Sequence, residues 1–546
     1  MGILDITNPN FWISIYLIIT NSIMLCFAGY KFLQVMQLGG YSTRAYLFWM
    51  KDTKAKWISR IAMLFLMTCV CVVVCNILFG RYDQYKLLSY IGLVFYYLFM
   101  IMFIVNIYKI PQKTPLKLTK RMWRLIIVYF LLMIIANALL LYLGYDYTYH
   151  FKYAGMTIAI LLIPVNVALA NVIIRPIENL IKSHYKNKSK RKLKKLTKLK
   201  VIGITGSYGK TSVKNFLKQI LSTKYKVYAS PSSFNTPMGL SKVILQELNE
   251  KHRIFIAEMG AIRRGDIEEI CDFVKPDIAI LTAIGNQHLK TFKTMENIKN
   301  TKYELIESLS EDGYAYFNNN SSDMNDLVNR CNLKNKNVIG LDNPELKFTC
   351  YDKVADENGL KFKLKLGDEV VDCQTKILGD HNIENILVAA SVAYDLGVKS
   401  KDIVRAIARL EPASHRLEIN KAENGVIILD DSFNANIIGT KMALKTLSYF
   451  EGRRKIIVTP GLVELGDLEA ESNEQFGKDI AKVCDIVVVV NKNNKNAILS
   501  GLISQNFDEN NVYLVDTLND ATKLFGTLLK RGDVVLIEND LPDNYS

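Results

Sequence analysis

The chain has 546 residues, half of them hydrophobic, and a formal net charge of +15. This length allows two to four domains. Nine cysteines without a CxxC pair argue against a zinc ribbon and a disulfide scaffold, and they suit a reducing compartment. Positive charge is compatible with nucleic-acid binding, but here the basic residues crowd the ends of apolar segments. We therefore expect no nucleic-acid partner.

Residues 1–175 are predicted to form a five-span transmembrane region. Five apolar runs approach or exceed the roughly 20 residues that cross a bilayer; they lie near residues 11–30, 57–79, 88–108, 125–145 and 153–174. The first run lacks a basic n-region, so we expect a span and not a cleavable signal peptide. Lys and Arg gather after the first and third runs, whereas "MGILDITNPN" has neither. This asymmetry predicts an outside N-terminus and a cytoplasmic C-terminal half.

A polybasic segment follows, and we predict a cytoplasmic linker over residues 176–200. Eleven of the 26 residues from Arg175 to Lys200 are basic. One interpretation is a solvated, partly helical linker. We favour a juxtamembrane segment bound to anionic membrane lipids, to which each charge contributes about 1 kcal/mol. Nucleic-acid binding is the least favoured of the three interpretations, because Tyr185 is the only aromatic residue within the basic cluster.

Residues 201–546 alternate short β-rich runs with helical stretches, which is typical of a parallel sheet with helices on both faces. One set of runs comprises "KVIGITG", "RIFIAEMG", "DIAILTAIG" and "YAYFNNN". A second set comprises "GVIILDDS", "KIIVTPG", "DIVVVVNK", "VYLVDT" and "DVVLIEN". We therefore predict two α/β domains, over residues 201–412 and 413–546.

The stretch "VIGITGSYGKTSVKNFL" predicts a phosphate-binding loop between a strand and a helix. Backbone N–H groups at such a glycine-rich turn cradle phosphate oxygens. Lys210 would reach the β- and γ-phosphates, and the Thr211 hydroxyl would ligate Mg²⁺. The spacing departs from G-x-x-x-x-G-K-[ST], because Ile204 occupies the place of the first glycine.

Two further residues follow the ends of later strands, where open α/β sheets bind their ligands. Glu258 ends "RIFIAEMG", and His288 follows "DIAILTAIGNQ". Taken alone, either residue is more often structural than a metal ligand. Their shared placement, in a domain that needs Mg²⁺, makes both candidate metal ligands.

Eight motifs follow one another between residues 201 and 470: "GITGSYGKTS", "SSFNTPMG", "IAEMGA", "LTAIGNQHL", "NTKYELIESL", "LGDHNIENILVAA", "SHRLE" and "LDDSFNAN". In this order they resemble the Mur ligases, and within them the MurF type. The variant spacing of the phosphate loop is similar to that of the same family. The resemblance implies an ATP-dependent amide ligase of bacterial cell-wall synthesis at the cytoplasmic membrane, with a P-loop-type central domain and a Rossmann-like C-terminal domain.

The resemblance implies a nucleotide site that draws on both domains. Arg416 would reach the phosphates and Asp431 the ribose, while Asn318 and Asn382 would face adenine. The phosphate loop supplies the remaining ATP contacts implied by the resemblance, from Gly206, Ser207, Gly209, Lys210, Thr211 and Ser212.

The same resemblance implies two Mg²⁺ ions. Thr211 and Glu258 would hold one ion and His288 the second, and Lys302 matches the family's lysine that CO₂ carbamylates. Carbamylation would convert a cation that the metals repel into an anion that can ligate them. The metals and Lys210 would spread the charge of the transferring phosphoryl group. The implied catalytic residues are Lys210, Glu258, His288, Lys302 and Arg416.

The implied reaction activates a carboxylate as an acyl phosphate, which an amino acid or dipeptide amine then attacks. Three departures from the family bear on its substrates. The family's UDP-sugar domain is replaced by the apolar region, Asn473 stands where a histidine is usual, and the chain ends "GDVVLIENDLPDNYS" where a Lys-Gly-Ser stretch is usual. We therefore expect a lipid-linked acceptor, with a UDP-linked precursor as the alternative, and the amine stays open.

Three other functions were weighed against this one. A transport ATPase should show a general Walker loop and a pathway through the membrane, and five spans without a clear intramembrane acid offer none. A non-catalytic organiser of wall synthesis would lose the metal ligands, which are present. A membrane-anchored poly-γ-glutamate-type ligase is the nearest competitor among enzymes, and the "DDSFNAN" stretch favours the MurF type.

Overall fold

The protein is described from a computed structural model, over residues 9–52, 60–70, 86–109, 114–143, 156–231, 234–285, 289–433, 436–463, 465, 468–490 and 494–539. The chain divides into two compact units. The first comprises residues 1–182 and 542–546, and the second comprises residues 183–541.

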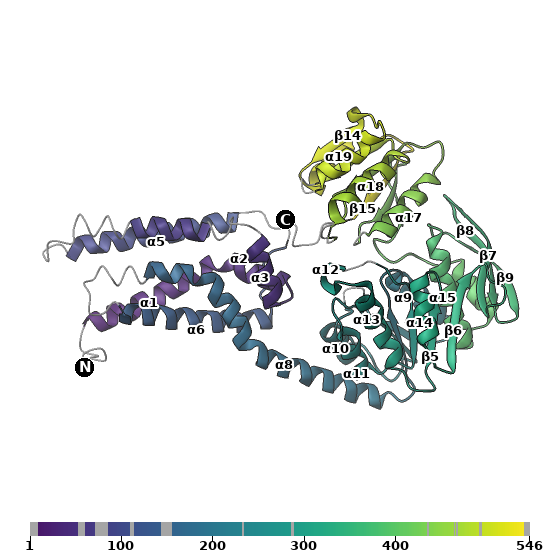
Figure 1. Ribbon diagram of the computed structural model, residues 1–546, viewed down its shortest axis with the longest axis horizontal. Helices are drawn as coiled ribbons and strands as arrows, with labels where there is room; N and C mark the ends of the chain where they lie inside the picture. The colour runs from purple at the N-terminus through teal and green to yellow at the C-terminus, as the bar shows by residue number, and fades with distance from the viewer. Residues whose placement is uncertain are drawn as a thin grey trace. The chain divides into compact units, whose positions relative to one another are not determined.

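The first unit is helical in its described part (Figure 1). Polar side chains join three of its helices inside a largely apolar core. Asn21 donates from Nδ2 to Asn137 Oδ1 at 2.7 Å, and Tyr96 donates to Asn21 Oδ1 at 2.7 Å. Such interhelical hydrogen bonds fix how apolar helices pack. The elements are α1 (Pro9–Ala28), α2 (Tyr30–Leu38), α3 (Thr43–Asp52), α5 (Lys86–Lys109), α6 (Lys120–Leu143) and α8 (Ile163–Lys195).

Two helices in the described residues have both the length and the hydropathy of a membrane span, judged by composition alone. They are Phe11–Ala28 and Lys120–Tyr142. Arg60–Val70 and Leu93–Lys109 are apolar but shorter. Three of the five expected spans, near 57–79, 125–145 and 153–174, extend into residues outside the described part. The five-span count therefore stays a prediction.

The linker expected at residues 176–200 is mostly helix. α8 runs through Pro176 and ends at Lys195, so the apolar stretch and the polybasic stretch share one helix. On one face of its basic part, Lys186 pairs with Glu269 at 3.2 Å and Lys190 with Asp272 at 3.4 Å. Both carboxylates belong to α11 (Asp266–Val274) of the following domain.

The larger sheet of the second unit has nine strands in the order β2-β3-β1-β4-β5-β6-β7-β8-β9. It is parallel from β2 to β7, as the sequence predicts, but β8 and β9 continue it as an antiparallel meander that the sequence analysis did not foresee. The strands are β1 (Lys200–Thr205), β2 (Val227–Ala229), β3 (Ile254–Glu258), β4 (Ile278–Leu281), β5 (Tyr314–Asn318), β6 (Asn335–Leu341), β7 (Phe348–Asp356), β8 (Gly359–Leu366) and β9 (Glu369–Thr375).

Helices cover both faces of this sheet, which confirms the α/β prediction (Figure 1). One buried cluster joins the strands to α9 (Lys210–Leu221), α15 (His381–Asp395) and α16 (Ser400–Ile407). The other joins them to α10 (Pro237–Gln246), α11, α13 (Met295–Glu307) and α14 (Ser322–Arg330). Apolar strands buried on both sides are what a parallel sheet requires.

The smaller sheet has six strands in the order β10-β11-β15-β12-β13-β14, all parallel except the β10–β11 pair. The last strand of the chain therefore lies between β11 and β12. Its strands are β10 (Glu418–Lys421), β11 (Ile427–Asp431), β12 (Lys455–Thr459), β13 (Ile486–Val490), β14 (Val512–Val515) and β15 (Val534–Glu538). Helices α17 (Ile437–Ser448), α18 (Glu469–Ala481) and α19 (Lys495–Ser504) pack on one face and α20 (Leu518–Leu528) on the other.

Candidate active site

The glycine-rich loop joins β1 to α9, as the sequence predicts. Gly206 has a φ of 153° and Gly209 a φ of 79°, which are backbone conformations that residues other than glycine rarely adopt. A Cβ on Gly206 would lie 2.1 Å from Thr282 Oγ1, so the loop is closely packed against the residue after β4. α9 begins at Lys210, and its first N–H groups form an anion-binding end.

Lys210 folds back over the loop. Its Nζ donates to the carbonyl oxygens of Gly206 at 2.6 Å and Ser207 at 3.1 Å. Burial lowers the pKa of Lys210 to about 8; Glu258 opposes this shift and Arg416 adds to it. The ammonium therefore occupies the centre of the loop, where a phosphate group would offer it stronger acceptors than two carbonyls.

Glu258 ends β3 and is the centre of a polar cluster. Thr211 Oγ1 lies 3.2 Å from its Oε2 and 3.3 Å from its Oε1, and Asn235 Nδ2 lies 3.5 Å from Oε1. Lys214 Nζ lies 2.7 Å from Oε2. A carboxylate, a hydroxyl and an amide are oxygen donors of the kind that Mg²⁺ prefers, so these residues fit a magnesium site.

The sequence analysis did not single out Lys214 or Asn235. A signal was present for both: Lys214 follows Lys210 by one helical turn, and Asn235 lies in the "SSFNTPMG" motif. His288, the candidate ligand of a second metal, lies outside the described residues.

Lys302 lies on the buried face of α13 and has no hydrogen-bond or ion-pair partner among the described residues. Burial and, to a smaller extent, Lys210 lower its pKa to about 7, whereas Asp266 and Glu304 act in the opposite direction. These surroundings therefore favour the neutral form of the amine more than water does. A neutral amine is the form that reacts with CO₂.

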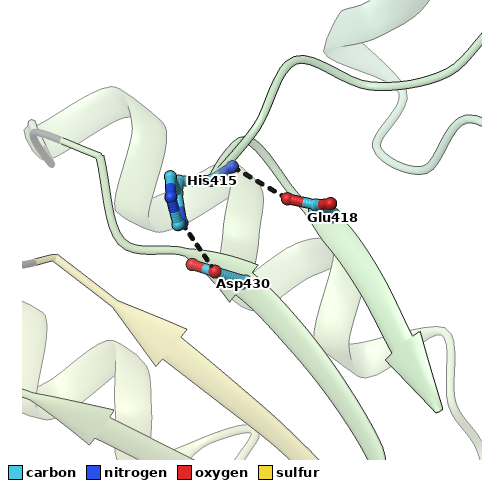
Figure 2. Close-up of side chains that lie close together, drawn as sticks. All are labelled: His415, Glu418 and Asp430. Carbon is cyan, nitrogen blue, oxygen red and sulfur yellow. Dashed lines mark hydrogen bonds and ion pairs between the residues drawn. The ribbon is translucent and has the colours of Figure 1, made fainter.

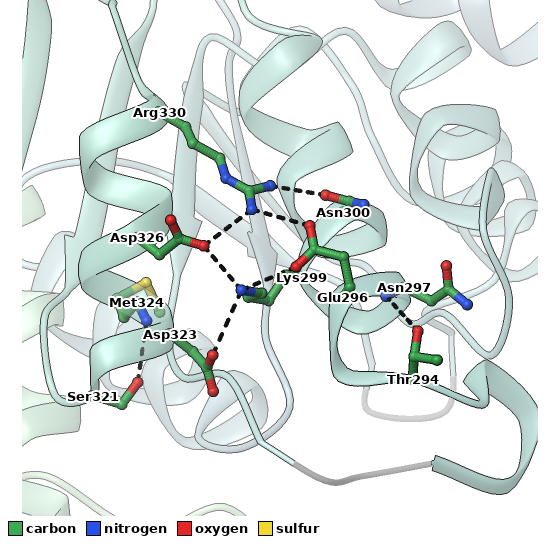
Figure 3. Close-up of polar contacts among 10 residues, drawn as sticks. All are labelled: Thr294, Glu296, Asn297, Lys299, Asn300, Ser321, Asp323, Met324, Asp326 and Arg330. Atoms are coloured by element: carbon green, nitrogen blue, oxygen red, sulfur yellow. Dashed lines mark hydrogen bonds and ion pairs between the residues drawn. The ribbon is translucent and has the colours of Figure 1, made fainter.

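The exposed side of α13 is held to α14 by a network of ion pairs (Figure 3). Lys299 lies 3.0 Å from Glu296, 2.9 Å from Asp326 and 3.7 Å from Asp323. Arg330 completes the network with contacts of 3.0 Å to Glu296 and Asp326. The network ties α13, the helix that carries Lys302, to α14.

Asn318 and Asn382, expected to face adenine, are both buried and hydrogen-bonded. Asn318, at the end of β5, donates to the Thr282 carbonyl at 3.0 Å and to Glu384 at 3.1 Å. Asn382 donates to the Leu378 carbonyl at 2.8 Å and accepts from Asn385 at 2.9 Å. These bonds tie the start of α15 to β5, and adenine binding stays a prediction.

Arg416 lies in a turn of unusual backbone conformation. Its neighbours His415 and Leu417 have φ values of 60° and 48°, a region that residues other than glycine seldom adopt. Its guanidinium carbon lies 4.8 Å from the centre of the Phe433 ring. Strained residues of this kind persist only where surrounding contacts hold them.

Three carboxylates supply those contacts. Glu418 accepts from the His415 backbone N–H at 3.1 Å, and the His415 ring lies 2.7 Å from Asp430 Oδ2 (Figure 2). Asp431 accepts from the Leu417 backbone N–H at 3.3 Å. The ligand atoms of His415, Glu418 and Asp430 lie within 4.8 Å of one another, as in many metal sites. Because each already bonds to the turn, we assign the group to holding Arg416 in place.

Glu538, which sequence reasoning missed, lies beside the candidate site residue Asp431. It pairs in register with Asp431 across β11 and β15, is 1% exposed, and neither carboxyl oxygen has a partner among the described residues. Burial and Asp431 raise its pKa well above the usual range, against the effect of Arg416. Burial also raises the pKa of Asp431 to about 6, and Arg416 opposes this. The sequence did contain a signal for Glu538, because an acidic residue ends the apolar run "DVVLIEN".

Asn473, which stands where the family usually has a histidine, is fully buried. Its Oδ1 accepts from the Leu462 N–H at 2.8 Å, and its Nδ2 donates to the carbonyls of Leu462 and Glu469 at 2.8 Å. Asn473 therefore holds the loop after β12 in place.

A glycine-rich strand-to-helix loop, a lysine inside it and a carboxylate at the end of the adjacent strand define a P-loop-type nucleotide-binding α/β protein. Family comparison makes this class specific. The Mur ligase middle domain matches residues 204–393, and the Mur ligase glutamate ligase domain matches residues 415–538. The chain belongs to the Mur ligase family.

Curated relatives carry the name UDP-N-acetylmuramoyl-tripeptide–D-alanyl-D-alanine ligase. The chain is 30% identical to that of Bacillus subtilis over 284 residues, which are 52% of this chain and 60% of the relative. It is 27% identical to that of Mycobacterium tuberculosis over 362 residues, which are 62% of this chain and 70% of the relative. The match thus leaves a large part of each relative uncovered.

Solved structures show the same fold. The MurF ligase of Thermotoga maritima in complex with ADP superposes with a TM-score of 0.57 at 26% identity, covering 66% of this chain and 80% of that one. MurF from Acinetobacter baumannii gives a TM-score of 0.59 at 22% identity, covering 66% and 77%.

Proposed function

We propose that this protein is an ATP-dependent ligase that joins a carboxylate acceptor to an amino acid or dipeptide amine in cell-wall or surface-polymer synthesis. The observation that carries the proposal is the cluster of Lys210, Thr211 and Glu258 at the glycine-rich loop. The amine of Lys302, which has no partner among the described residues, is buried close enough for the charge of Lys210 to act on it. A nucleotide-binding protein without ligase activity has no evident use for such an amine.

In this proposal Lys210 exchanges its two carbonyl acceptors for the β- and γ-phosphates of ATP. Thr211 and Glu258 hold Mg²⁺, which supplies charge stabilisation to the transferring phosphoryl group. The neutral Lys302 amine would form a bond to the carbon of CO₂ and release a proton, and the resulting carbamate anion would suit a second Mg²⁺, with His288 as the further candidate ligand.

The second sheet supplies the remaining contacts in the proposal. Arg416, held in its strained turn, neutralises phosphate charge, and Asp431 accepts from the ribose. The acceptor carboxylate then attacks the γ-phosphate, releasing ADP and forming an acyl phosphate. The amine attacks the acyl carbon, and phosphate leaves as the carbon–nitrogen bond forms.

The test is mass spectrometry of the product formed by full-length protein in membranes with ATP, an acceptor and a panel of amines. Lys302→Ala should lose most activity and regain part of it with added short carboxylic acids, which can replace the carbamate. Lys302→Arg should stay inactive, because a guanidinium remains cationic. Full activity of unrescued Lys302→Ala would remove Lys302 from the site. Preference for glutamate as the amine would indicate a poly-γ-glutamate-type ligase instead.

We also propose that residues 1–175 cross the bacterial cytoplasmic membrane five times. α6 supports this, because it is apolar on both sides: Met122, Tyr129 and Met133 are buried, whereas Ile127 and Ile135 on the opposite side are more than half exposed. A helix that is apolar all round needs protein or lipid on every side. Cysteines placed in "MGILDITNPN" should react with an impermeant thiol reagent on intact cells, and one near residue 117 should not. Labelling at residue 117 from outside would contradict the orientation.

The acceptor is proposed to be lipid-linked, because residues 1–175 are proposed to hold the enzyme at the membrane and the following part of α8 is strongly basic. His184, Asn187, Lys188 and Arg191 are exposed on the side of α8 opposite the ion-paired lysines. Positive charge beside a membrane attracts anionic head groups and would concentrate a lipid pyrophosphate there.

Full-length protein in membranes should therefore use a lipid-linked acceptor better than a UDP-linked one. Lys188→Gln with Arg191→Gln should reduce the use of the lipid-linked acceptor alone, whereas Lys401→Gln, which removes an exposed lysine from α16, should change neither. Equal use of both acceptors by the intact protein would refute the lipid hypothesis.

A further inference from the structure

The buried ion pair between Lys214 and Glu258 is unexplained by the proposed reaction. The two side chains are only 6% and 3% exposed, and Lys214 Nζ lies 2.7 Å from Glu258 Oε2. Lys214 follows Lys210 by one turn of α9, so both lysines project from the same side of the helix. One lysine therefore faces the phosphate loop, and the other faces the candidate metal ligand.

This pair gives Glu258 a cationic partner before any metal arrives. A carboxylate as deeply buried as Glu258 is costly unless it is paired. Lys214 holds Oε2, while Thr211 and Asn235 make longer contacts with the carboxylate. The bond from Lys214 also fixes the orientation of the Glu258 carboxylate toward the first turn of α9. When one carboxylate oxygen is held, the carboxylate rotates less and the second oxygen keeps its direction.

We propose that Lys214 is a positioning residue of the metal site: it aims Glu258 toward Thr211 and weakens Mg²⁺ binding until nucleotide phosphates are present. The reason is electrostatic, because a divalent cation bound to Glu258 would lie within a few ångströms of the Lys214 ammonium. Phosphate oxygens supply the negative charge that offsets this repulsion. The metal then enters together with the nucleotide. The inference rests on the proposed metal-ligand role of Glu258.

The experiment compares two lysines on the same helix in full-length, detergent-solubilised protein without nucleotide. Lys214→Gln keeps a hydrogen-bond donor but removes the charge, and Lys218→Gln removes an exposed charge one turn further along α9. The probe is Mn²⁺, measured by electron paramagnetic resonance. Lys214→Gln should bind Mn²⁺ at least about tenfold more tightly than the unmodified protein. Lys218→Gln should leave the affinity unchanged.

Two further variants separate charge from structure. Lys214→Arg keeps the charge and should bind Mn²⁺ as weakly as the unmodified protein. Adding Glu258→Gln to Lys214→Gln should abolish the gain, because the ligand is lost. If Lys214→Gln is too unstable for direct titration, its melting temperature should rise with Mn²⁺ more than that of the unmodified protein, since the metal replaces the missing cation.

A merely structural ion pair would lower the melting temperature of Lys214→Gln without tightening Mn²⁺ binding or adding Mn²⁺-dependent stabilisation, and that result overturns the inference. Failure of the proposed function is distinguishable from this. If the unmodified protein does not bind nucleotide in the presence of Mg²⁺, this result contradicts the proposed function. Normal nucleotide binding together with unchanged Mn²⁺ affinity in Lys214→Gln contradicts this inference alone.

Discussion

Replacement of Gly206 by alanine should disable the phosphate loop. The new Cβ would lie 2.1 Å from Thr282 Oγ1 and 3.0 Å from the Ala283 nitrogen, at a φ of 153°. Backbone strain of this kind costs about 1–3 kcal/mol, and forcing an extra methyl into a packed site costs about 1–3 kcal/mol. The free energy of unfolding of the second unit should therefore fall by roughly 2–6 kcal/mol, unless the loop moves and gives up its nucleotide geometry instead.

The assay measures thermal unfolding and ADP binding on the same full-length protein. Gly206→Ala should lower the melting temperature by roughly 3–8 °C or lose ADP affinity, and adding Thr282→Ala should recover only the part that the steric clash causes. Gly526→Ala is the matched control. Gly526 lies inside α20 with no atom within 4 Å of an added Cβ, so alanine should stabilise the helix by about 0.5–1 kcal/mol. Unchanged stability and ADP affinity in Gly206→Ala would refute the reasoning.

Three charged groups give further expected outcomes. Carbamate at Lys302, detected by ¹³C NMR with labelled bicarbonate, should increase as pH rises through about 7, because only the neutral amine reacts; a signal that does not change with pH would contradict this. Glu538→Gln should unfold at a higher temperature than the unmodified protein at pH 8 and at a similar one below pH 4.5. The raised pKa of Glu538 makes the native state lose stability as pH rises above its usual 4.5, and equal melting curves at pH 8 would count against it. Lys299→Met should lower the melting temperature by roughly a few degrees without changing ADP affinity, and the difference should shrink in about 0.5 M NaCl; a loss of ADP affinity would show that the network reaches the site.

Local sequence patterns determined the strands and the phosphate loop. Runs such as "KVIGITG" and "DIVVVVNK" are apolar and bounded by turn residues, and they form β1 and β13 as expected. The glycines of the loop could be predicted because a tight strand-to-helix turn needs residues with positive φ. The ability to adopt positive φ depends on the type of the single residue. Glu258 was readable because it ends a predicted strand.

Only the tertiary structure decided which side chains meet. Lys214 contacts Glu258 because β3 lies beside β1, and Glu538 lies beside Asp431 because the last strand inserts between β11 and β12. The antiparallel meander of β8 and β9 likewise depends on which strand accepts them at the edge of the sheet. Hydrophobic period and turn chemistry act over a few residues, whereas strand order is set by burying surfaces that are distant in the chain. The sequence therefore placed residues at strand ends, and the sheet order decided which of these residues became neighbours.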